Sequence, residues 1–299
     1  MPTIDLSQLP SPQIIEPLDF ETILVDVKAV MLAAFPADQQ ASVAASLSLE
    51  SEPLNVIAQA IAYRELLLRQ RINEGAAACM LSHAEGADLD NLAANLDTKR
   101  LTITPETDTS NAVMESDEAL RLRAQSAFEG MSVAGPSAAY EYYARSASGK
   151  VADARATSPA PAEVVLAILS TDGDGTASPE LLAAVTAAVN DEEVRPLGDR
   201  VTVRSADIID YSIDAELFLY PGPESEPIIN AAMASLRAFL SNNNKKIGRD
   251  VARSAISASL HVQGVQRVVL RSPAADLQIS DTQAARNIGY SVEKGGTDE

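Results

Sequence analysis

The sequence predicts an α+β protein in which a helical N-terminal third precedes a mixed α/β C-terminal half. Residues 20–98 carry apolar positions at helical spacing and almost no strand signal. From about residue 150, strand-like segments alternate with amphipathic helices, and glycine and proline mark the turns between them. We expect four parts: an extended arm (1–19), a helical bundle segment (20–100), a connecting strand and helices (101–148), and a domain of two similar halves with helices on small sheets (149–299).

Composition argues against several classes of protein. The 299 residues carry 23 Lys and Arg against 42 Asp and Glu, a net charge of −19, which disfavours broad binding to a nucleic-acid backbone. Cys79 is the one cysteine of the sequence, so no internal disulfide can form. The start shows no signal peptide, and the longest apolar run, Ala29–Phe35, is far shorter than the roughly 20 residues of a membrane span. We expect a soluble, cytoplasmic protein with no cofactor, no nucleic-acid partner and no membrane partner.

The arm is predicted to be extended because its prolines block regular helix. These prolines are Pro2, Pro10, Pro12 and Pro17. A free, solvated tail rarely carries as many aliphatic residues as this arm, which has Leu6, Leu9, Ile14, Ile15 and Leu18. The arm is therefore expected to lie either on its own chain or on a neighbouring subunit, and both alternatives stay open.

Helices are predicted next, from residue 20 to residue 98. Their expected bounds are Phe20–Phe35, Pro53–Glu74, Ala76–His83 and Leu89–Leu96. Asp19 and Asp88 are the expected N-caps of the first and last. Pro36 is expected to end the first helix and Gly75 the second.

Each of these amphipathic helices must bury its apolar stripe against another element. The candidate interface residues are the large aliphatic side chains at helical spacing: Leu54, Ile57, Ile61, Leu68, Ile72, Leu89, Leu92 and Leu96. An intrachain bundle would bury them, and so would packing against helices of partner chains. The pattern does not separate these two possibilities.

The connecting segment is predicted to hold a short strand, a polar loop and two helices. Leu101–Pro105 is strand-like, residues 106–115 are polar, and a helix follows from Ser116 or Asp117 to about Phe128. Arg123 is expected on the solvent side of that helix, and a second helix covers Ser137–Ala147.

The C-terminal domain is predicted to repeat one pattern, in which a strand, a Gly/Pro turn and an apolar-faced helix follow each other. The expected strands are Val151–Ala156, Glu163–Leu169, Arg200–Val203, Ile208–Tyr220 and Val265–Leu270. The expected helices begin at the Ser178 cap, at Glu226 and at Asp250, and they end near Asn190, Leu240 and His261. The segment Ser158–Pro161 is expected to join the first two strands. At an offset of about fifty residues the two halves match in architecture rather than residue by residue.

The motif Asp172-Gly173-Asp174-Gly175 could chelate a hard cation through its two carboxylates. However, Ala177 and Ala183 stand where a calcium loop needs glycine and glutamate. Ser178 stands where a dinucleotide fingerprint needs its third glycine. Ordinary turn chemistry therefore explains the motif best. A metal-dependent hydrolase or phosphotransferase that adds Glu180 to the two aspartates remains a rival hypothesis.

The remaining polar candidates favour structural roles. Cys79 and His83 are four residues apart on a predicted helix, but two ligands do not make a metal site. His261 is expected to be a core or cap histidine. The pair Lys245-Lys246, with Arg249, is expected to complement a helix C-terminus. No catalytic residue, metal site or cofactor site is predicted, and the protein is not expected to be an enzyme.

The order of several segments resembles the baseplate J-like family of contractile-tailed phages and R-type bacteriocins. The most telling segment is Val194–Val201, and the resemblance covers nearly the whole chain. The other matching segments include Leu49–Leu54, Ala62–Glu65, Arg69–Glu74, Gly86–Asp90, Arg100–Pro105, Phe128–Gly130, Arg145–Ala147, Val151–Asp153, Tyr220–Pro227 and Gly264–Val268.

The resemblance implies a structural role without catalysis. It implies a heterotrimeric wedge core of two J-like chains and a smaller I-like protein. Wedges would join into a sixfold ring around the hub and spike and hold the sheath extended until contraction. The implied partners are other copies of the chain, the I-like wedge protein, and hub, spike and sheath-proximal proteins. The implied location is the bacterial host cytoplasm during assembly and then the baseplate of a virion or tail-like particle.

On this resemblance, the helices within Pro53–Leu96 look like the part that forms an interchain bundle, and residues 149–299 like the part that pairs J-like chains. A non-tail oligomeric scaffold or coat protein is a further alternative. Arg195 is expected to be structural, placed by Pro196 to tie a helix end to the next strand.

Overall fold

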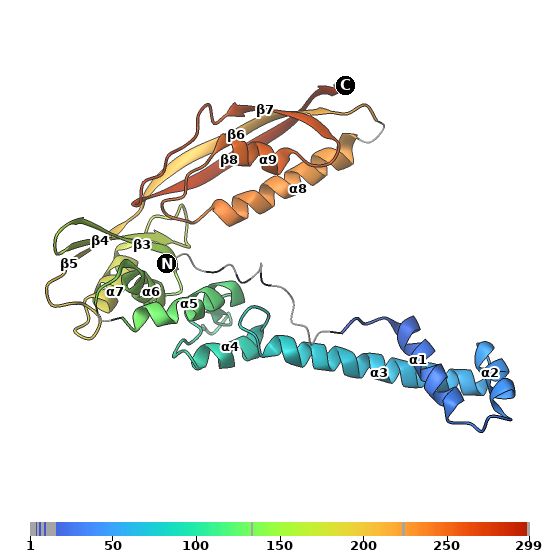
Figure 1. Cartoon of the computed structure of the whole chain (residues 1–299). Coiled ribbons are helices and arrows are strands. Elements are labelled where there is room, and N and C mark those ends of the chain that lie inside the picture. The colour runs from blue at the N-terminus through green and yellow to red at the C-terminus, as the bar shows by residue number, and fades with distance from the viewer. Residues whose placement is uncertain are drawn as a thin grey trace. The chain divides into compact units, whose positions relative to one another are not determined.

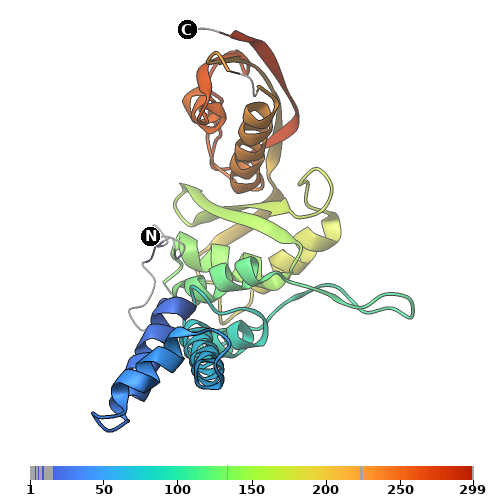
Figure 2. The same ribbon diagram turned by 90° about the vertical axis from the view of Figure 1, so that its right-hand side faces the viewer.

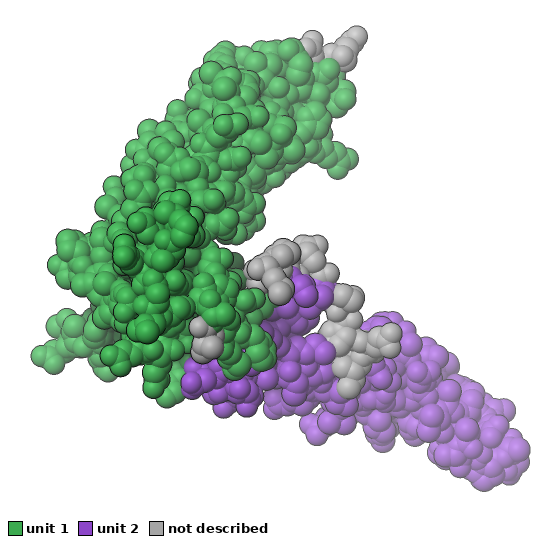
Figure 3. Space-filling model, turned by 60° about the vertical axis from the view of Figure 1, so that its left-hand side comes forward, with its two compact units in different colours: residues 1, 98–299 green, residues 2–97 purple. Residues whose placement is uncertain are grey.

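The computed structural model describes residues 4, 6, 9, 16–132, 134–222 and 225–297. These residues form two compact units, one within residues 2–97 and one within residues 98–299 (Figures 1 and 3), and each is described by itself. Most of the predicted arm, residues 1–19, lies outside the described residues.

The unit within residues 2–97 is helical. Its helices are α1 (Phe20–Ala33), α2 (Gln40–Ser48), α3 (Pro53–Ala78) and α4 (Gly86–Ala94). Asp19 caps α1 as predicted, because its side chain accepts a hydrogen bond from the backbone N–H of Glu21. The core of this unit forms where α1 and α2 pack on α3, through residues such as Ile23, Val27 and Leu47.

Three predictions for this unit are wrong. α3 continues through Gly75 to Ala78, so neither a break at Gly75 nor a separate helix over Ala76–His83 exists. A helical glycine costs about 1 kcal/mol without ending a helix, and Gly75 keeps an ordinary negative φ here. Asp88 lies in the first turn of α4 rather than at its cap, which is Glu85. α2 was not predicted, because its alanines and serines give little apolar contrast.

The unit within residues 98–299 begins with a small antiparallel pair, β1 (Thr102–Thr104) and β2 (Val113–Met114). The predicted loop over 106–115 therefore includes the short strand β2. The helices α5 (Asp117–Gly130) and α6 (Ser137–Ala147) follow. Ser116 caps α5, because its hydroxyl accepts from the N–H of Ala119.

The first larger sheet has the strand order β3-β4-β5. Its strands are β3 (Val151–Ala160), β4 (Glu163–Ser170) and β5 (Arg200–Ser205), and α7 (Pro179–Val189) connects the last two. The predicted linker Ser158–Pro161 is largely strand instead. Pro159 is tolerated there because β3 is an edge strand. The chain turns at Ala162, which has a φ of 62°.

The two faces of β4 are both covered. Val164, Leu166 and Ile168 face α6 and α7 in one core. On the other face, Ala167 and Leu169 pack in a small cluster with Ile247 and Ala284, which lie later in the chain, in the half that contains the second sheet. A single residue, Ala206, separates β5 from the next strand, so one run of chain links both sheets.

The second sheet has the order β7-β6-β8. Its strands are β6 (Asp207–Leu219), β7 (Val265–Ser272) and β8 (Gln283–Thr297), and α8 (Ser225–Asn243) and α9 (Arg253–Leu260) lie on one face (Figures 1 and 2). Alternate β6 residues from Tyr211 to Leu219 form the core with these helices. β8 was not predicted, because glycines and mostly exposed side chains hide its alternation.

Each larger sheet has a central strand with one antiparallel and one parallel neighbour. β4 pairs antiparallel with β3 and parallel with β5, and β6 pairs antiparallel with β7 and parallel with β8. The predicted α+β class, with helices on small sheets, is confirmed.

Candidate assembly interface

Among the described residues, α3 packs against its own chain along one side. Its buried residues are Asn55, Ala58 and Ala62, and they pack against α1 and α2. The small alanines let the neighbouring helices approach closely. Asn55 also donates from its side-chain amide to the carbonyl of Leu49, at 2.9 Å, which fixes the entry to α3.

A first row of large aliphatic side chains on α3 is exposed. It consists of Ile57, Ile61, Leu68 and Ile72, whose exposed fractions run from 45% to 59%. These four residues belong to the set that the sequence singled out. The described residues of the chain therefore leave this stripe exposed, and no intrachain bundle among them covers these four side chains.

A second exposed row follows another side of the same helix. It consists of Val56, Tyr63 and Leu67, which are 50%, 56% and 38% exposed. At about 100° per residue, the buried row and the two exposed rows fall on three different sides of α3. Polar side chains such as Arg64 and Arg71 lie between the two exposed rows. Exposed apolar stripes of this kind, rimmed by polar residues, are typical of an interface.

The other predicted interface residues lie differently. Leu54 is half-buried and packs against the α1–α3 core. Leu89 is fully buried, and Leu92 and Leu96 are half-buried. These four are less exposed than the α3 rows, so among the predicted interface residues the exposed apolar surface is that of Ile57, Ile61, Leu68 and Ile72.

Polar contacts hold the chain segment before α1 against α3. The side chain of Asn73 donates to the carbonyl of Glu16 at 2.9 Å and accepts from its N–H at 3.1 Å. Arg69 pairs with Glu16 at 3.2 Å and with Glu65 at 2.6 Å. At Glu16, therefore, the end of the predicted arm lies on its own chain.

The Asp172–Gly175 motif forms a turn between β4 and α7. The carbonyl of Gly175 accepts from the N–H of Ser170 at 2.8 Å, and Gly173 and Gly175 both have positive φ. Asp172 pairs with Lys150 at 3.1 Å. The backbone N–H of Thr176 donates to Asp174 and lowers the pKa of its carboxyl group. The Asp174 carboxylate thus makes a turn contact, as the turn interpretation predicts, and the Asp172 carboxylate forms an ion pair outside the turn.

No group of three or more His, Cys, Asp or Glu side chains within the described ranges is arranged to hold a metal ion. Cys79 is exposed at the C-cap of α3, and His83 lies in the following turn, so the predicted shared helical face is wrong. His261 is the C-cap of α9. Arg249 donates to the carbonyl of Asn242 in the last turn of α8, as expected for helix C-terminal charge.

Sequence reasoning missed a buried ion pair between β2 and α5. Arg123, expected on the solvent side, is 6% exposed and donates to both carboxylate oxygens of Glu115 at 2.7 and 2.8 Å. It also donates to the carbonyl of Lys99. A glutamate eight positions before an arginine carries no periodic signal, so only the fold reveals this pair.

The guanidinium of Arg195 donates to the carbonyl of Asp199 at 3.0 Å, just before β5 begins. This contact lies within the turn, so the predicted tie from the end of α7 to the next strand stays a prediction. No helix among the described residues is both long enough and apolar enough to cross a membrane.

Known proteins resemble the chain along its whole length. Models of three domains match it in order: the baseplate J-like N-terminal domain (50–107), the central domain (132–205) and the C-terminal domain (211–288). Baseplate protein J of Escherichia phage P2 is 54% identical over 303 residues, which covers 100% of both chains. A solved baseplate of the anti-feeding prophage contains a chain with 14% identity and a TM-score of 0.42, and the match covers 60% of this chain and 43% of that chain. On the family matches and the phage relative, the chain belongs to the baseplate J-like protein family.

Proposed function

We propose that this chain is a structural component of a contractile-tail baseplate in which α3 packs against helices of partner chains. The observation that carries the proposal is that two apolar rows on α3 are exposed among the described residues. One row is Ile57, Ile61, Leu68 and Ile72, and the other is Val56, Tyr63 and Leu67. The family and the phage relative support the setting.

The two rows together favour two partner helices rather than one. A single helix covers one stripe of its neighbour, whereas α3 presents two stripes on different sides. A second copy of this chain and a smaller I-like protein would supply both partners in a heterotrimeric wedge. Leu→Ala or Ile→Ala changes in such a seam would each remove a buried side chain and weaken assembly.

Wedges of this kind would join into a sixfold ring around the hub and spike, with residues 149–299 pairing copies of the chain. The C-terminal domain model of the family matches residues 211–288 within this part of the chain. Repetition around a ring multiplies interfaces that are individually weak. A ring that holds the sheath extended and then releases it needs interfaces with two packings of similar free energy, not a reactive side chain. The particle would be a phage or an R-type bacteriocin.

The test is Ile61→Asp in the full chain, co-expressed with the neighbouring open reading frame. Ile61 is 45% exposed, so the change should alter the stability of the folded chain by less than about 1 kcal/mol. In an assembled helix seam it would bury an unpaired charge at a cost of several kcal/mol. We expect a folded chain that no longer forms the hetero-oligomer.

Ile288→Asp is the matched control, because Ile288 is a comparably exposed isoleucine on β8. It should leave formation of the helical wedge unchanged. If the Ile61→Asp chain still enters the hetero-oligomer, the seam does not include this row. No contact among the described residues favours the rival hydrolase or the non-tail scaffold, so neither is proposed.

A further inference from the structure

The unit within residues 98–299 holds two sheet halves, and the chain passes from one to the other at Ala206. The first half is built on β3, β4 and β5, and the second half on β6, β7 and β8. The N–H of Ala206 donates to the carbonyl of Ile168 in β4 at 2.8 Å. The following N–H, that of Asp207, donates to the carbonyl of Thr282 just before β8 at 3.0 Å. Rotation about the two backbone bonds of Ala206 therefore turns one half against the other and need break neither hydrogen bond.

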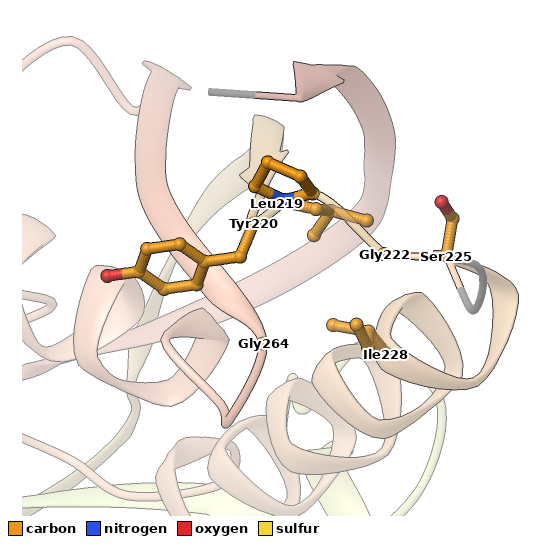
Figure 4. A pocket seen from close by; sticks show the side chains of 7 residues that line it. Leu219, Tyr220, Gly222, Ser225, Ile228 and Gly264 are labelled. Atoms are coloured by element: carbon orange, nitrogen blue, oxygen red, sulfur yellow. The ribbon is translucent and has the colours of Figure 1, made fainter. Parts of the chain in front are cut away.

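Each half has a core of its own. The core of the first half lies between its sheet and the helices α6 and α7, and that of the second half between its sheet and α8 and α9. The family's central-domain match ends at residue 205 and its C-terminal match begins at residue 211, on either side of Ala206. The pocket of about 260 Å³ at the end of β6 also lies within the second half, since Leu219, Ile228 and Gly264 line it (Figure 4). Each half is thus packed as a unit.

The junction between the halves buries little apolar surface. Its cluster consists mainly of alanines and holds Ala152, Ala167, Leu169, Ala206, Ile208, Ile247 and Ala284. A pocket of about 120 Å³ adjoins this cluster, and charged side chains from both halves line it, among them Asp174 and Arg286. Because apolar stabilisation scales with the area buried, a junction of alanines beside a polar pocket is weaker than either core.

One loop of the second half reaches into the junction. This latch loop, residues 244–248, lies between α8 and α9, and its Ile247 is 6% exposed within the junction cluster. Two positive φ angles shape the loop, 63° at Lys245 and 71° at Gly248. A lysine rarely adopts such an angle, so the contacts that the loop makes must hold it in this conformation.

Asp153 of β3 holds the latch loop from the first half. Its Oδ2 accepts from the backbone N–H of Ile247 at 2.8 Å. Its Oδ1 accepts from the guanidinium of Arg145 at 2.8 Å and from the N–H of Ala154 at 2.9 Å. The side chain of Asp153 is 17% exposed, so these hydrogen bonds are largely shielded from water.

Two further polar contacts that cross the junction are exposed. The ammonium group of Lys245 donates to the carbonyl of Thr171 at 3.3 Å. Arg155 pairs with Asp281 at 3.1 Å, and their side chains are about half exposed. Exposed ion pairs contribute little, so the contact between Asp153 and the latch loop is the stronger polar tie.

We propose that the two halves form a latched hinge. Ala206 is the pivot, the latch loop holds the halves in the present arrangement, and the carboxylate of Asp153 is the group that retains the loop. Release of the loop exposes little apolar surface and leaves both cores intact. The inference goes beyond the proposed function and does not rest on it, because the motion lies within one chain. In the proposed baseplate, the hinge would give the chain two shapes without unfolding either half.

Distances between spin labels test the hinge in the full chain. Cys79 is exposed, so a Cys79→Ala background is used. Labels at Ala187→Cys on α7 and Ala234→Cys on α8, both exposed positions, form the pair that spans the halves. Labels at Ala234→Cys and Ser291→Cys on β8 form a pair within the second half. Pulsed electron paramagnetic resonance should give one narrow distance for each pair while the latch is intact.

Two variants release the latch in different ways. In Asp153→Asn the side-chain oxygen stays on Arg145, and the new amide group then faces the N–H of Ile247, donor against donor. Loss of a hydrogen bond to a charged group shifts an equilibrium about tenfold or more, which raises a minor arrangement from about 1% to about 10% of molecules. Ile247→Ala keeps the N–H but removes the side chain from the junction. With both variants we expect a second distance for the spanning pair and no change for the pair within the second half.

Asp276→Asn is the matched control. Asp276 also accepts a backbone N–H, that of Arg253 at 2.7 Å, but both residues belong to the second half. This change should leave the spanning pair unaltered. A single narrow spanning distance with both latch variants, or several distances while the latch is intact, would overturn the inference. Equal broadening of both pairs would also overturn it, because the variants would then unfold the second half instead of releasing it.

Discussion

The buried pair between Glu115 and Arg123 allows a prediction whose magnitude follows from its geometry. Their side chains are 5% and 6% exposed, and two hydrogen bonds of 2.7 and 2.8 Å join them. Arg123 also holds the carbonyl of Lys99, and the N–H of Leu101 donates to Glu115 at 3.1 Å. The pair therefore fastens the segment before β1 and the strand β2 to α5.

Removing one partner should cost more than removing both. Arg123→Met leaves the Glu115 carboxylate buried. Of the donors named above, the N–H of Leu101 is then the one that still reaches this carboxylate. Breaking a buried pair in this way costs about 3–5 kcal/mol. For a unit of about 200 residues, 1 kcal/mol lowers Tm by about 2–4 °C, so a fall of roughly 6–20 °C is expected. Adding Glu115→Leu removes the stranded charge, and the double variant should be at least about 2 kcal/mol more stable than the sum of the single effects predicts.

Scanning calorimetry of the full chain measures all four members of this cycle. Arg204→Met is the matched control, because Arg204 is 45% exposed and its pair with Asp207 spans 3.7 Å. It should change stability by about 0.5 kcal/mol or less. Single variants that lose under about 1 kcal/mol, or a double variant that is simply additive, would show that this pair does not hold the segment as described.

Three further outcomes follow from the C-terminal unit. Burial, and then the hydrogen bond to Asp199, raise the pKa of Tyr140, so its proton stays bound in the folded state while an unfolded tyrosine loses it near pH 10. Its stabilising effect is complete below about pH 10 and is lost above it, so Tyr140→Phe should flatten the alkaline fall in Tm measured between pH 8 and 11. Leu236→Ala, at a fully buried position of α8, should cost about 2–5 kcal/mol in urea unfolding. Gly264→Ala should lower stability by about 1 kcal/mol or more, because of its positive φ and its approach to Ile228; an unchanged urea midpoint would contradict this.

Local signals in the sequence were enough for the fold class and for most helices and strands. Asp19 and Ser178 were correctly predicted as caps because a cap is a contact between residues near in sequence. β8 was not predicted from the sequence. A strand that contains Gly289, Gly295 and Gly296 and is mostly exposed shows neither alternation nor enrichment in β-branched residues.

The candidate interface was visible in the sequence only as an apolar stripe. The stripe showed that Ile57 and Ile61 must be buried somewhere, but not whether their own chain buries them. That answer came from Ala58 and Ala62, whose small side chains form the intrachain contact and leave the larger ones outside. The predicted exposure of Arg123 was wrong because its burial depends on Glu115, a partner that no spacing rule connects to it.

Assembly of α3 with helices of partner chains can be tested in a single preparation. The chain is co-expressed with the neighbouring open reading frame, and the purified species is measured by light scattering. We expect a stable hetero-oligomer of fixed ratio, with two copies of this chain per copy of the partner, that Ile61→Asp abolishes. A monodisperse chain that elutes alone, with its α3 rows still accessible to solvent, would contradict it.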